Sequence, residues 1–570
     1  MSLIAEIQRS QLITTYGIGS IYDALDYSVI IAGLENWRPE ETEILHEERL
    51  QQKLKVDFFR QPRVIEDVAT IPSFRFPEWV FCPKCKSLKP IYNLQNRTDK
   101  KCGRCKVNYV PVRFIVSCPK GHLDDFPWSW WVHKGNSCER PKLKIHTTGR
   151  TTSLAGIRVS CENEGCEASR SLEGIFGKNA LRGLRCRGKM PWLGPRENED
   201  CNEIPRVLQR GSASVYYSVT ESAISIPPFS ERIYSFLNGL LVPLEQIPDD
   251  ALPNVLRGLL EKTGEIFSVE ALVEAVKTRK NKNTQEKEII DLRQAEYEAL
   301  CHPEAKDAKD EFVAEEEEIS VLFRDQMARL VLVSRLREVR ALTGFTRIAP
   351  DGPAAPISKK PLNWLPAAEM KGEGLFIELN RKTMAKWVSK SDPKFLRRVN
   401  KLEKMRMQQL CKNKAWAEKR VINPQFLLIH TLAHILIQQL ILDCGYSSSA
   451  LRERLYINDG SDGKPEMSGF LIYTATSDSE GSLGGLVRQG KKNRFTEVMK
   501  KAIEQARWCS NDPLCMESEG QGHNSLNLAA CHSCCLLPET SCELRNCYLD
   551  RGVLIGTNGR PETGFFPDNF

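Results

Sequence analysis

The hydrophobic and polar positions change period several times along the chain, which indicates a protein of mixed helices and strands. The run SVYYSVTESAISIP, after residue 207, predicts strand, and amphipathic helix follows to about residue 274. The pattern VLVSRLREVRAL predicts a helix that ends at Gly344, a residue type that often follows a helix. The last 150 residues alternate between helix and strand patterns.

The longest apolar stretch, residues 421–442, contains no Lys, Arg, Asp or Glu and so imitates a membrane span. His430, His434 and Gln438 recur every four residues and would form a polar stripe along a helix. Because such a stripe is costly in lipid, we predict a buried helix and no membrane partner. The two histidines lack the Glu of a zinc protease helix, which favours a polar helix face over a catalytic metal.

Shifts in composition divide the chain into five predicted segments. A length of 570 residues is too great for one hydrophobic core, and 41% apolar with 27% charged residues is typical of soluble globular proteins. The expected fold class is α+β multidomain. The segments are an N-terminal α/β segment (1–75), zinc-binding modules of the zinc-ribbon type (76–206), a β and then helical middle (207–350), a basic helical region (351–420) and an α/β C-terminal domain with a cysteine cluster (421–570).

The chain has twenty cysteines and no recognisable export signal, because Glu6 and Arg9 interrupt the short apolar runs of the N-terminus. We therefore expect a cytoplasmic protein. A reducing cytosol does not maintain disulfide frameworks, so clustered cysteines indicate metal ligands. Two to four structural zinc ions are expected.

Two C-x2-C pairs with sixteen residues between them give the clearest metal site: Cys82, Cys85, Cys102 and Cys105. Two such turns close a tetrahedral shell of thiolates, which is typical of structural zinc. A looser set predicts a second four-cysteine site: Cys161, Cys166, Cys186 and Cys201. Four further residues either bind a third metal or belong to an aromatic cluster around Trp128, Trp130 and Trp131: Cys118, His122, His133 and Cys138.

The C-terminal region offers seven thiols within 39 residues, more than one tetrahedral site can use. Cys531 and Cys534 form another C-x2-C pair. We predict that they bind zinc with Cys542 and with either Cys509 or Cys515.

Motifs for a nucleotide motor are missing from the sequence. No G-x4-G-K-[ST] occurs, and the nearest segment, GSLGGLVRQGKK, has the wrong spacing. We therefore expect no ATP hydrolysis by this chain alone and no catalytic residues. Asp459, Asp478 and Glu480 leave a metal-dependent nuclease open as an alternative, although Asp in Gly/Ser loops is ordinary turn chemistry.

A basic stretch suggests a nucleic-acid surface, although the net charge of the chain is only +7. Residues 381–420 contain fourteen Lys or Arg and three Asp or Glu, with Trp387, Phe395 and Trp416 interleaved. The cations would neutralise phosphates, while the aromatic side chains either stack on bases or pack inward. The predicted DNA contacts are Arg335, Arg337, Lys394, Arg397, Arg398 and Lys401. A protein-only scaffold with a solvated basic helix is the remaining alternative.

Several segments together resemble the DrmB family of the DISARM antiphage systems. They are SQLITTYGIGS, RFIVSCPKGHLDDFPWSWWVH, SRLREVRALTGFTRIAPDG, NWLPAAEMKGEGLFIEL, HTLAHILIQQLILDCGYSSSALRERLY and the tail from SDSEGSLGGLV to ACHSCCLLPETSCELRNCYLDRGVL. The tail alone also resembles the region that follows the motor in Mrf-type repair helicases, where a four-cysteine metal site would correspond to Cys531, Cys534 and Cys542 with one upstream thiol.

The resemblance implies a bacterial defence protein that pairs with a DrmA-like helicase on phage DNA. It also implies a heterodimer in which the partner supplies the motor that this chain lacks. The doublet Cys534–Cys535 and the long gap to Cys542 depart from the Mrf-type pattern, which leaves the C-terminal ligand set open.

Overall fold

A computed structural model describes the chain except residues 1–6, 25–26, 65–69, 92–100, 137, 148–152, 238–239, 264–266, 286–290, 304–309, 413–420, 475–484, 558 and 567–570. The chain forms two compact units. The first unit comprises Met1–Leu45, Val56–Glu221 and Arg340–Ala368, and the second comprises His46–Lys55, Ser222–Val339 and Glu369–Phe570. Both units are assembled from separate stretches, and the five consecutive segments inferred from the sequence stay a prediction.

The first unit consists mainly of short antiparallel strands. One sheet has the order β1–β2–β5, a second β10–β9–β14, and a third β13–β12–β11–β7–β6–β8. The only helix of four residues or more described there is α2 (Trp128–His133). The strands are β1 (Ile21–Asp23), β2 (Ser28–Ile31), β3 (Thr42–Leu45), β4 (Phe58–Pro62), β5 (Ser73–Arg75), β6 (Trp79–Phe81), β7 (Ser87–Pro90), β8 (Val110–Pro111), β9 (Phe114–Ser117), β10 (Leu123–Asp125), β11 (Leu143–Thr147), β12 (Ile157–Cys161), β13 (Ser169–Ser171) and β14 (Arg206–Gln209).

The second unit carries most of the helices, and its sheet has the order β15–β17–β18–β20–β19, with β16 paired to β17. Its strands, of which β15, β17 and β18 extend beyond the residues of this unit, are β15 (Tyr217–Ile224), β16 (Val313–Glu317), β17 (Met327–Thr346), β18 (Trp364–Leu379), β19 (Leu451–Asn458) and β20 (Met467–Thr474). The helices are α1 (Glu48–Leu54), α3 (Arg232–Leu237), α4 (Leu241–Glu245), α5 (Leu252–Thr263), α6 (Val269–Gln285), α7 (Leu292–Cys301), α8 (Arg381–Ser389), α9 (Pro393–Lys412), α10 (Pro424–Cys444), α11 (Gly485–Gly490), α12 (Lys492–Ala506) and α13 (Gly552–Ile555).

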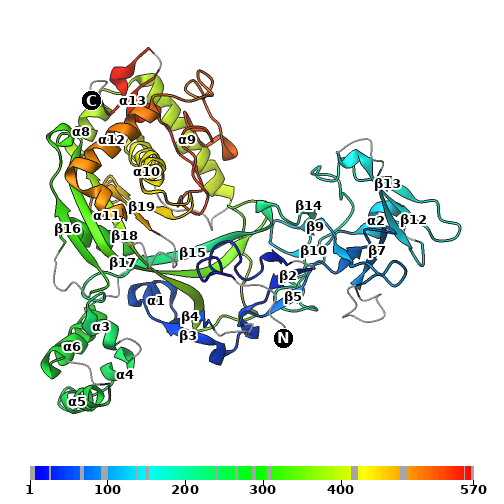
Figure 1. Ribbon diagram of the computed structural model, residues 1–570, viewed down its shortest axis with the longest axis horizontal. Coiled ribbons are helices and arrows are strands. Elements are labelled where there is room, and N and C mark those ends of the chain that lie inside the picture. Colours follow the sequence, from blue (N-terminus) through cyan, green and yellow to red (C-terminus); the bar gives the residue numbers. More distant parts are fainter. Residues whose placement is uncertain are drawn as a thin grey trace. The chain divides into compact units, whose positions relative to one another are not determined.

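Helix α10 is the centre of the core of the second unit. Asn423 caps its N-terminus by accepting a hydrogen bond from the backbone N–H of Phe426 (2.8 Å), and Gly445 ends it with a positive φ of 71°. It packs against α12, α13, β19 and β20, and Figure 1 shows it among α9, α12 and β19. It is the one described helix that is long and apolar enough to span a membrane, and 78% of its most apolar window is buried inside the protein. The prediction of a buried helix is confirmed.

The helix predicted over VLVSRLREVRAL is wrong, because these residues belong to the long strand β17. Both faces of this strand are largely covered, so its apolar residues show no simple alternation. The arginines of this strand lie at irregular intervals, so in the sequence they resemble the polar face of a helix. Three β-branched residues, Val331, Val333 and Val339, are fully buried in the strand and suit its pleated backbone.

Candidate metal centres

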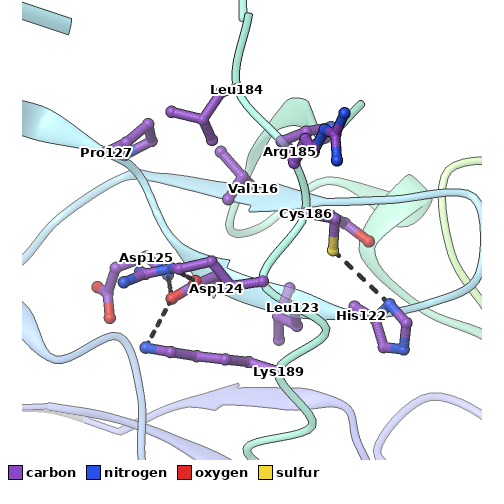
Figure 2. Close-up of a pocket in the computed structure, with 13 residues that line it drawn as sticks. Val116, His122, Leu123, Asp124, Asp125, Pro127, Leu184, Arg185, Cys186 and Lys189 are labelled. Atoms are coloured by element: carbon purple, nitrogen blue, oxygen red, sulfur yellow. Dashed lines mark hydrogen bonds and ion pairs between the residues drawn. The ribbon is translucent and has the colours of Figure 1, made fainter. Parts of the chain in front are cut away.

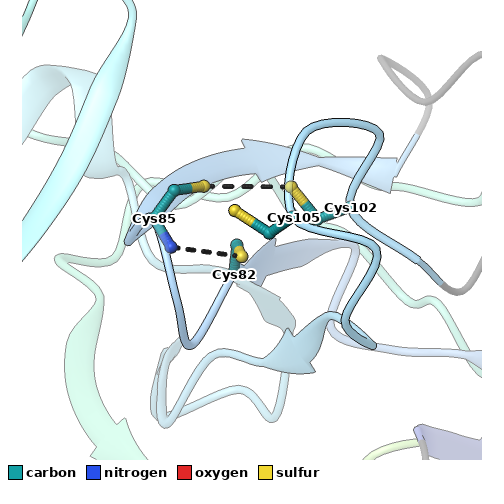
Figure 3. Close-up of side chains that lie close together, drawn as sticks. All are labelled: Cys82, Cys85, Cys102 and Cys105. Atoms are coloured by element: carbon teal, nitrogen blue, oxygen red, sulfur yellow. Dashed lines mark hydrogen bonds between the residues drawn. The ribbon is translucent and has the colours of Figure 1, made fainter.

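The first cysteine cluster consists of the four thiols predicted from the two C-x2-C pairs: Cys82, Cys85, Cys102 and Cys105. Cys82 directly follows β6, and the turn places the backbone N–H of Cys85 3.4 Å from the Cys82 Sγ. The Sγ atoms of Cys85 and Cys102 are 3.8 Å apart, and the four thiols point toward one centre (Figure 3). The donor set and its size fit a tetrahedral zinc ion.

The second cluster joins three thiols and an imidazole: Cys118, His122, Cys186 and Cys201. The His122 Nδ1 lies 3.3 Å from the Cys118 Sγ and 3.6 Å from the Cys186 Sγ. The His122 Nε2 lies 2.9 Å from a carboxylate oxygen of Glu199. A carboxylate that orients the far nitrogen of an imidazole is typical of zinc-binding histidines.

The third cluster has the same composition: His133, Cys138, Cys161 and Cys166. The His133 Nε2 lies 3.4 Å from the Cys166 Sγ, and the Cys138 and Cys161 Sγ atoms are 3.6 Å apart. The His133 Nδ1 bonds to the backbone carbonyl of Ser129 (2.8 Å), so the Nε2 is left to face the thiols. His133 ends helix α2, whose Trp128 and Trp131 are buried as the aromatic-cluster alternative expected.

These two clusters correct the predicted grouping, since the structure does not bring Cys161, Cys166, Cys186 and Cys201 together, nor Cys118, His122, His133 and Cys138. Strand pairing explains why the ligands are distributed differently between the two clusters. Arg206 of β14 pairs with Ser117 of β9, which brings Cys201 beside Cys118. Leu143 of β11 pairs with Cys161 of β12, which brings Cys161 near Cys138. The ligands of each cluster are so far apart in the sequence that their spacing does not show which of them belong together.

The fourth cluster lies in the tail and uses both upstream thiols: Cys509, Cys515, Cys531 and Cys534. The Sγ–Sγ distances are 3.5 Å for Cys509–Cys531 and 3.8 Å for Cys515–Cys534. The choice of Cys542 as a ligand of this cluster is therefore wrong. Cys542 lies instead against helix α10, with its Sγ 3.4 Å from the Nε2 of His430.

Hydrogen bonds favour the thiolate form of one cysteine in each of the first two clusters. A hydrogen bond from the Cys186 thiol lowers the pKa of Cys118 to about 4 in spite of burial. Burial raises the pKa of Cys102, but the backbone N–H of Cys105 and further donors bring that pKa down to about 6. In contrast, burial raises the pKa of Cys105, and the hydrogen bond to Cys118 raises the pKa of Cys186. Because zinc binds thiolates, zinc binding at either cluster releases protons.

A pocket borders the second cluster, but its carboxylates are already used. His122 and Cys186 lie at one end of it and the two aspartates near Lys189 at the other (Figure 2). Asp124 forms ion pairs with Arg187 (2.6 Å) and Lys189 (3.1 Å). Asp125 accepts two backbone N–H bonds of 3.1 Å, and burial raises its pKa to about 7. The pocket therefore offers no free pair of carboxylates for metal-dependent hydrolysis.

Asp459, one of the carboxylates considered for a nuclease, lies in a turn. Its side chain accepts a hydrogen bond from the backbone N–H of Ser461 (3.0 Å) and another from the side chain of Asn423 (3.0 Å). This is the turn chemistry expected of Asp in such a loop. Asp478 and Glu480 lie outside the described residues.

Three of the predicted DNA contacts are exposed on helix α9: Lys394, Arg397 and Lys401. Arg335 is exposed on β17. Arg398 is half-buried and donates to the backbone carbonyl of Ser518 (2.6 Å), so it supports the tail. Arg337 is buried, with its guanidinium 3.2 Å from the Glu369 carboxylate, and its assignment to a DNA surface is wrong. The sequence pattern predicts a helix here and not the strand β17, so it gives no sign of this burial.

The aromatic residues of the basic region that the structure describes pack inward. Trp387 donates to the backbone carbonyl of Thr563 (2.8 Å) and contacts Phe395 and Phe565 at ring distances of 6.1 and 5.8 Å. Trp416 lies outside the described residues. Neither Trp387 nor Phe395 is therefore placed to stack on bases.

Comparison with known proteins gives two family matches and a curated relative. Residues 8–217 match a domain of unknown function, DUF8724, and residues 432–535 match the MrfA Zn-binding domain. The fourth cluster lies entirely inside the second match, and with the other cysteine clusters it makes structural zinc the cofactor of this protein. The DISARM protein DrmB of Bacillus paralicheniformis is 32% identical over an alignment that covers 95% of this chain and 99% of the relative. The chain therefore belongs to the DrmB family of DISARM proteins.

Proposed function

We propose that this chain is a cytoplasmic, DNA-binding component of a DISARM antiphage defence system, without catalytic residues of its own, that helps to load a DrmA-like helicase onto foreign DNA. The observation that carries the DNA-binding part is a row of exposed cations on helix α9. The family relative is named as a DISARM protein, which supports the defence role.

The cationic row consists of Lys394, Arg397, Lys401 and Lys404, all exposed. Spacings of three, four and three residues place them on one face of the helix, along about 15 Å of its length. The opposite face contributes Val399 and Leu402 to the core of the second unit. The helix is thus anchored by its apolar face. The Nζ of Lys401 lies 3.4 Å from the Glu519 carboxylate, but this ion pair joins two exposed side chains and contributes little, so the row still presents its cations to a chain of phosphates.

Such a surface favours binding that does not depend on base sequence. Lysine and arginine side chains neutralise phosphates, whereas sequence is recognised at base edges or by stacking. Because the aromatic residues described beside the row pack inward, the contacts should be mainly electrostatic. That property suits a protein that must engage any foreign DNA.

A helicase partner would supply the ATP-driven step. The sequence contains no phosphate-binding loop, and each cysteine cluster already has four protein donors, which is the composition of structural and not catalytic zinc. Trp508 and Leu514, beside two ligands of the fourth cluster, are 73% and 81% exposed. Exposed large apolar side chains of this kind are common at protein interfaces.

Replacing the four cations of the α9 row with Gln should weaken DNA binding strongly while the protein stays folded. Each lost phosphate contact lowers the slope of log K against log salt by about 0.7 to 0.9, so the quadruple variant should lose about 3 from the slope. Fluorescence anisotropy with short DNA at several salt concentrations measures both quantities.

A matched control neutralises four other lysines of the second unit, each already paired with a carboxylate at 2.8 to 3.3 Å: Lys464, Lys491, Lys492 and Lys501. It makes the same change in net charge and should leave the slope nearly unchanged. An equal loss in both variants would show that the effect is one of overall charge, and an unchanged slope in the α9 variant would exclude this helix as the DNA surface.

A further inference from the structure

The polar stripe of helix α10 faces the C-terminal tail in the interior of the second unit. The Nδ1 of His430 bonds to the backbone carbonyl of Tyr548 (3.2 Å), and the Nδ1 of His434 to that of Cys535 (2.9 Å). A carbonyl oxygen only accepts hydrogen bonds, so each Nδ1 carries the proton. The Nε2 of each neutral imidazole then carries no proton and has a free lone pair, as in metal-binding histidines.

Both Nε2 atoms point at the same carboxylate, that of Glu453 on strand β19. The distances are 3.1 Å from His430 to Oε1 and 3.5 Å from His434 to Oε2. All three side chains are fully buried, and the His434 Nε2 and Glu453 Oε2 have no hydrogen-bond partner. Lone pairs that face lone pairs in a dry interior repel one another unless a cation lies between them.

The fourth group at this position is the thiol of Cys542, with its Sγ 3.4 Å from the His430 Nε2. Two backbone N–H groups, of Leu544 (3.3 Å) and Asn546 (3.2 Å), point at this sulfur. The same kind of N–H···S contact occurs at Cys82 in the first cluster, at 3.4 Å. Burial and the Glu453 carboxylate raise the pKa of the Cys542 thiol, and these two N–H groups oppose that rise. A cation at this position would make the thiolate the stable form.

We propose that His430, His434, Glu453 and Cys542 bind a fifth structural metal ion, of the zinc class. Their four ligand atoms lie within 4.8 Å of one another. Zinc bonds of about 2.0 to 2.3 Å place tetrahedral ligands about 3.3 to 3.8 Å apart, close to the distances found here. Two imidazoles, a carboxylate and a thiolate are donors that zinc accepts, whereas magnesium and calcium prefer oxygen alone.

Charge balance explains why this site is completely buried. One thiolate and one carboxylate cancel the two positive charges of the ion, and the imidazoles are neutral. In contrast, four thiolates around zinc leave a net charge of −2, and the first and fourth clusters each have partly exposed ligands. Among the described residues, no Lys or Arg forms an ion pair with Glu453, so none of them replaces the ion.

The proposed ion would join three separate parts of the second unit: helix α10, strand β19 and the tail that follows the fourth cluster. With four protein donors and no exposed ligand it has no open position for substrate, so its role is structural. The ligands span 112 residues from His430 to Cys542, and a helix with two histidines gives no sign of such distant partners.

The test counts zinc in the purified full-length chain by native mass spectrometry. We expect five ions in the wild type and four in each of two variants, Cys542→Ser and His434→Gln. The matched control is Cys547→Ser, a buried thiol of the same tail whose Sγ lies 3.8 Å from the Arg545 carbonyl and belongs to no cluster. It should keep five ions.

Equal zinc counts in the wild type and in soluble Cys542→Ser would overturn the proposal, because the cluster would then be held by protons alone. If both ligand variants are insoluble, the wild type decides. Five ions support the fifth site, and four or fewer ions overturn it.

Discussion

Replacing both Cys82 and Cys85 with Ser is expected to leave most of the protein insoluble. Structural zinc contributes roughly 10 kcal/mol or more to folding, which is as large as the net stability of a whole domain. The first cluster has only a small core of its own, with Val80, Ile91 and Tyr109 as its buried residues besides cysteine. The zinc ion thus replaces a hydrophobic core that these short strands do not provide.

The fraction of soluble protein after expression, followed by circular dichroism of what remains, measures this effect. Cys444→Ser is the matched control, because this half-buried thiol belongs to no cluster and its Sγ lies 3.9 Å from the Gly485 carbonyl. It should be soluble and unfold as the wild type does. A soluble double variant with the wild-type melting temperature would show that the first cluster is not a structural zinc site.

Breaking the buried pair of Arg454 and Glu296 should cost the second unit about 3 to 5 kcal/mol, the usual penalty for an uncompensated buried charge. Two hydrogen bonds of 2.6 Å join the guanidinium to both carboxylate oxygens, and the two side chains are 1% and 0% exposed. Tyr456 also donates to this carboxylate (3.1 Å). Arg454→Met removes the guanidinium bonded to Glu296. Glu296→Gln should cost less, because the Glu338 carboxylate still lies 3.8 Å from the Arg454 guanidinium.

Urea unfolding followed by fluorescence measures the loss as a shift of the midpoint. The control is Lys464→Gln, which removes an exposed ion pair of 2.8 Å with Asp291 and should cost less than about 1 kcal/mol. The Arg454 arrangement also predicts lower stability in acid. Burial alone would raise the pKa of Glu296, but the attraction of Arg454 lowers that pKa overall. The stability that the ionised Glu296 contributes is therefore lost as the pH falls through the lowered pKa. Equal urea midpoints for Arg454→Met and the control would show that the buried Arg454–Glu296 pair does not stabilise the second unit as proposed.

The sequence predicts those features of the structure that depend on residues close together in the chain. The C-x2-C pairs fix their thiols within one turn, and the uncharged run of α10 with its polar stripe predicts a buried helix. The exchange of ligands between the second and third clusters depends on strand register, such as Arg206 against Ser117, which no spacing reveals. The helix predicted over β17 is wrong because the strand is largely covered on both faces and lacks a simple alternation, and because Arg337 is paired with Glu369 inside the protein.

The ligand role of Cys542 was assigned to the wrong site for a related reason. Seven thiols compete within the tail, and the sequence alone does not say which of them turns toward α10. The two histidines of α10 signalled a polar stripe, but their partner Glu453 lies on a strand that follows the helix. The site exists only once the helix, the strand and the tail pack together.

The most direct test of the proposed function is co-expression of this chain with a DrmA-like helicase, followed by gel filtration in about 0.5 M salt. At that ionic strength the Debye length is only about 4 Å, so attraction between surface charges and binding to contaminating DNA are largely screened. An interface that includes apolar side chains such as Trp508 and Leu514 should survive. We predict one peak that contains both proteins. Two separate peaks, with both proteins folded, would contradict it.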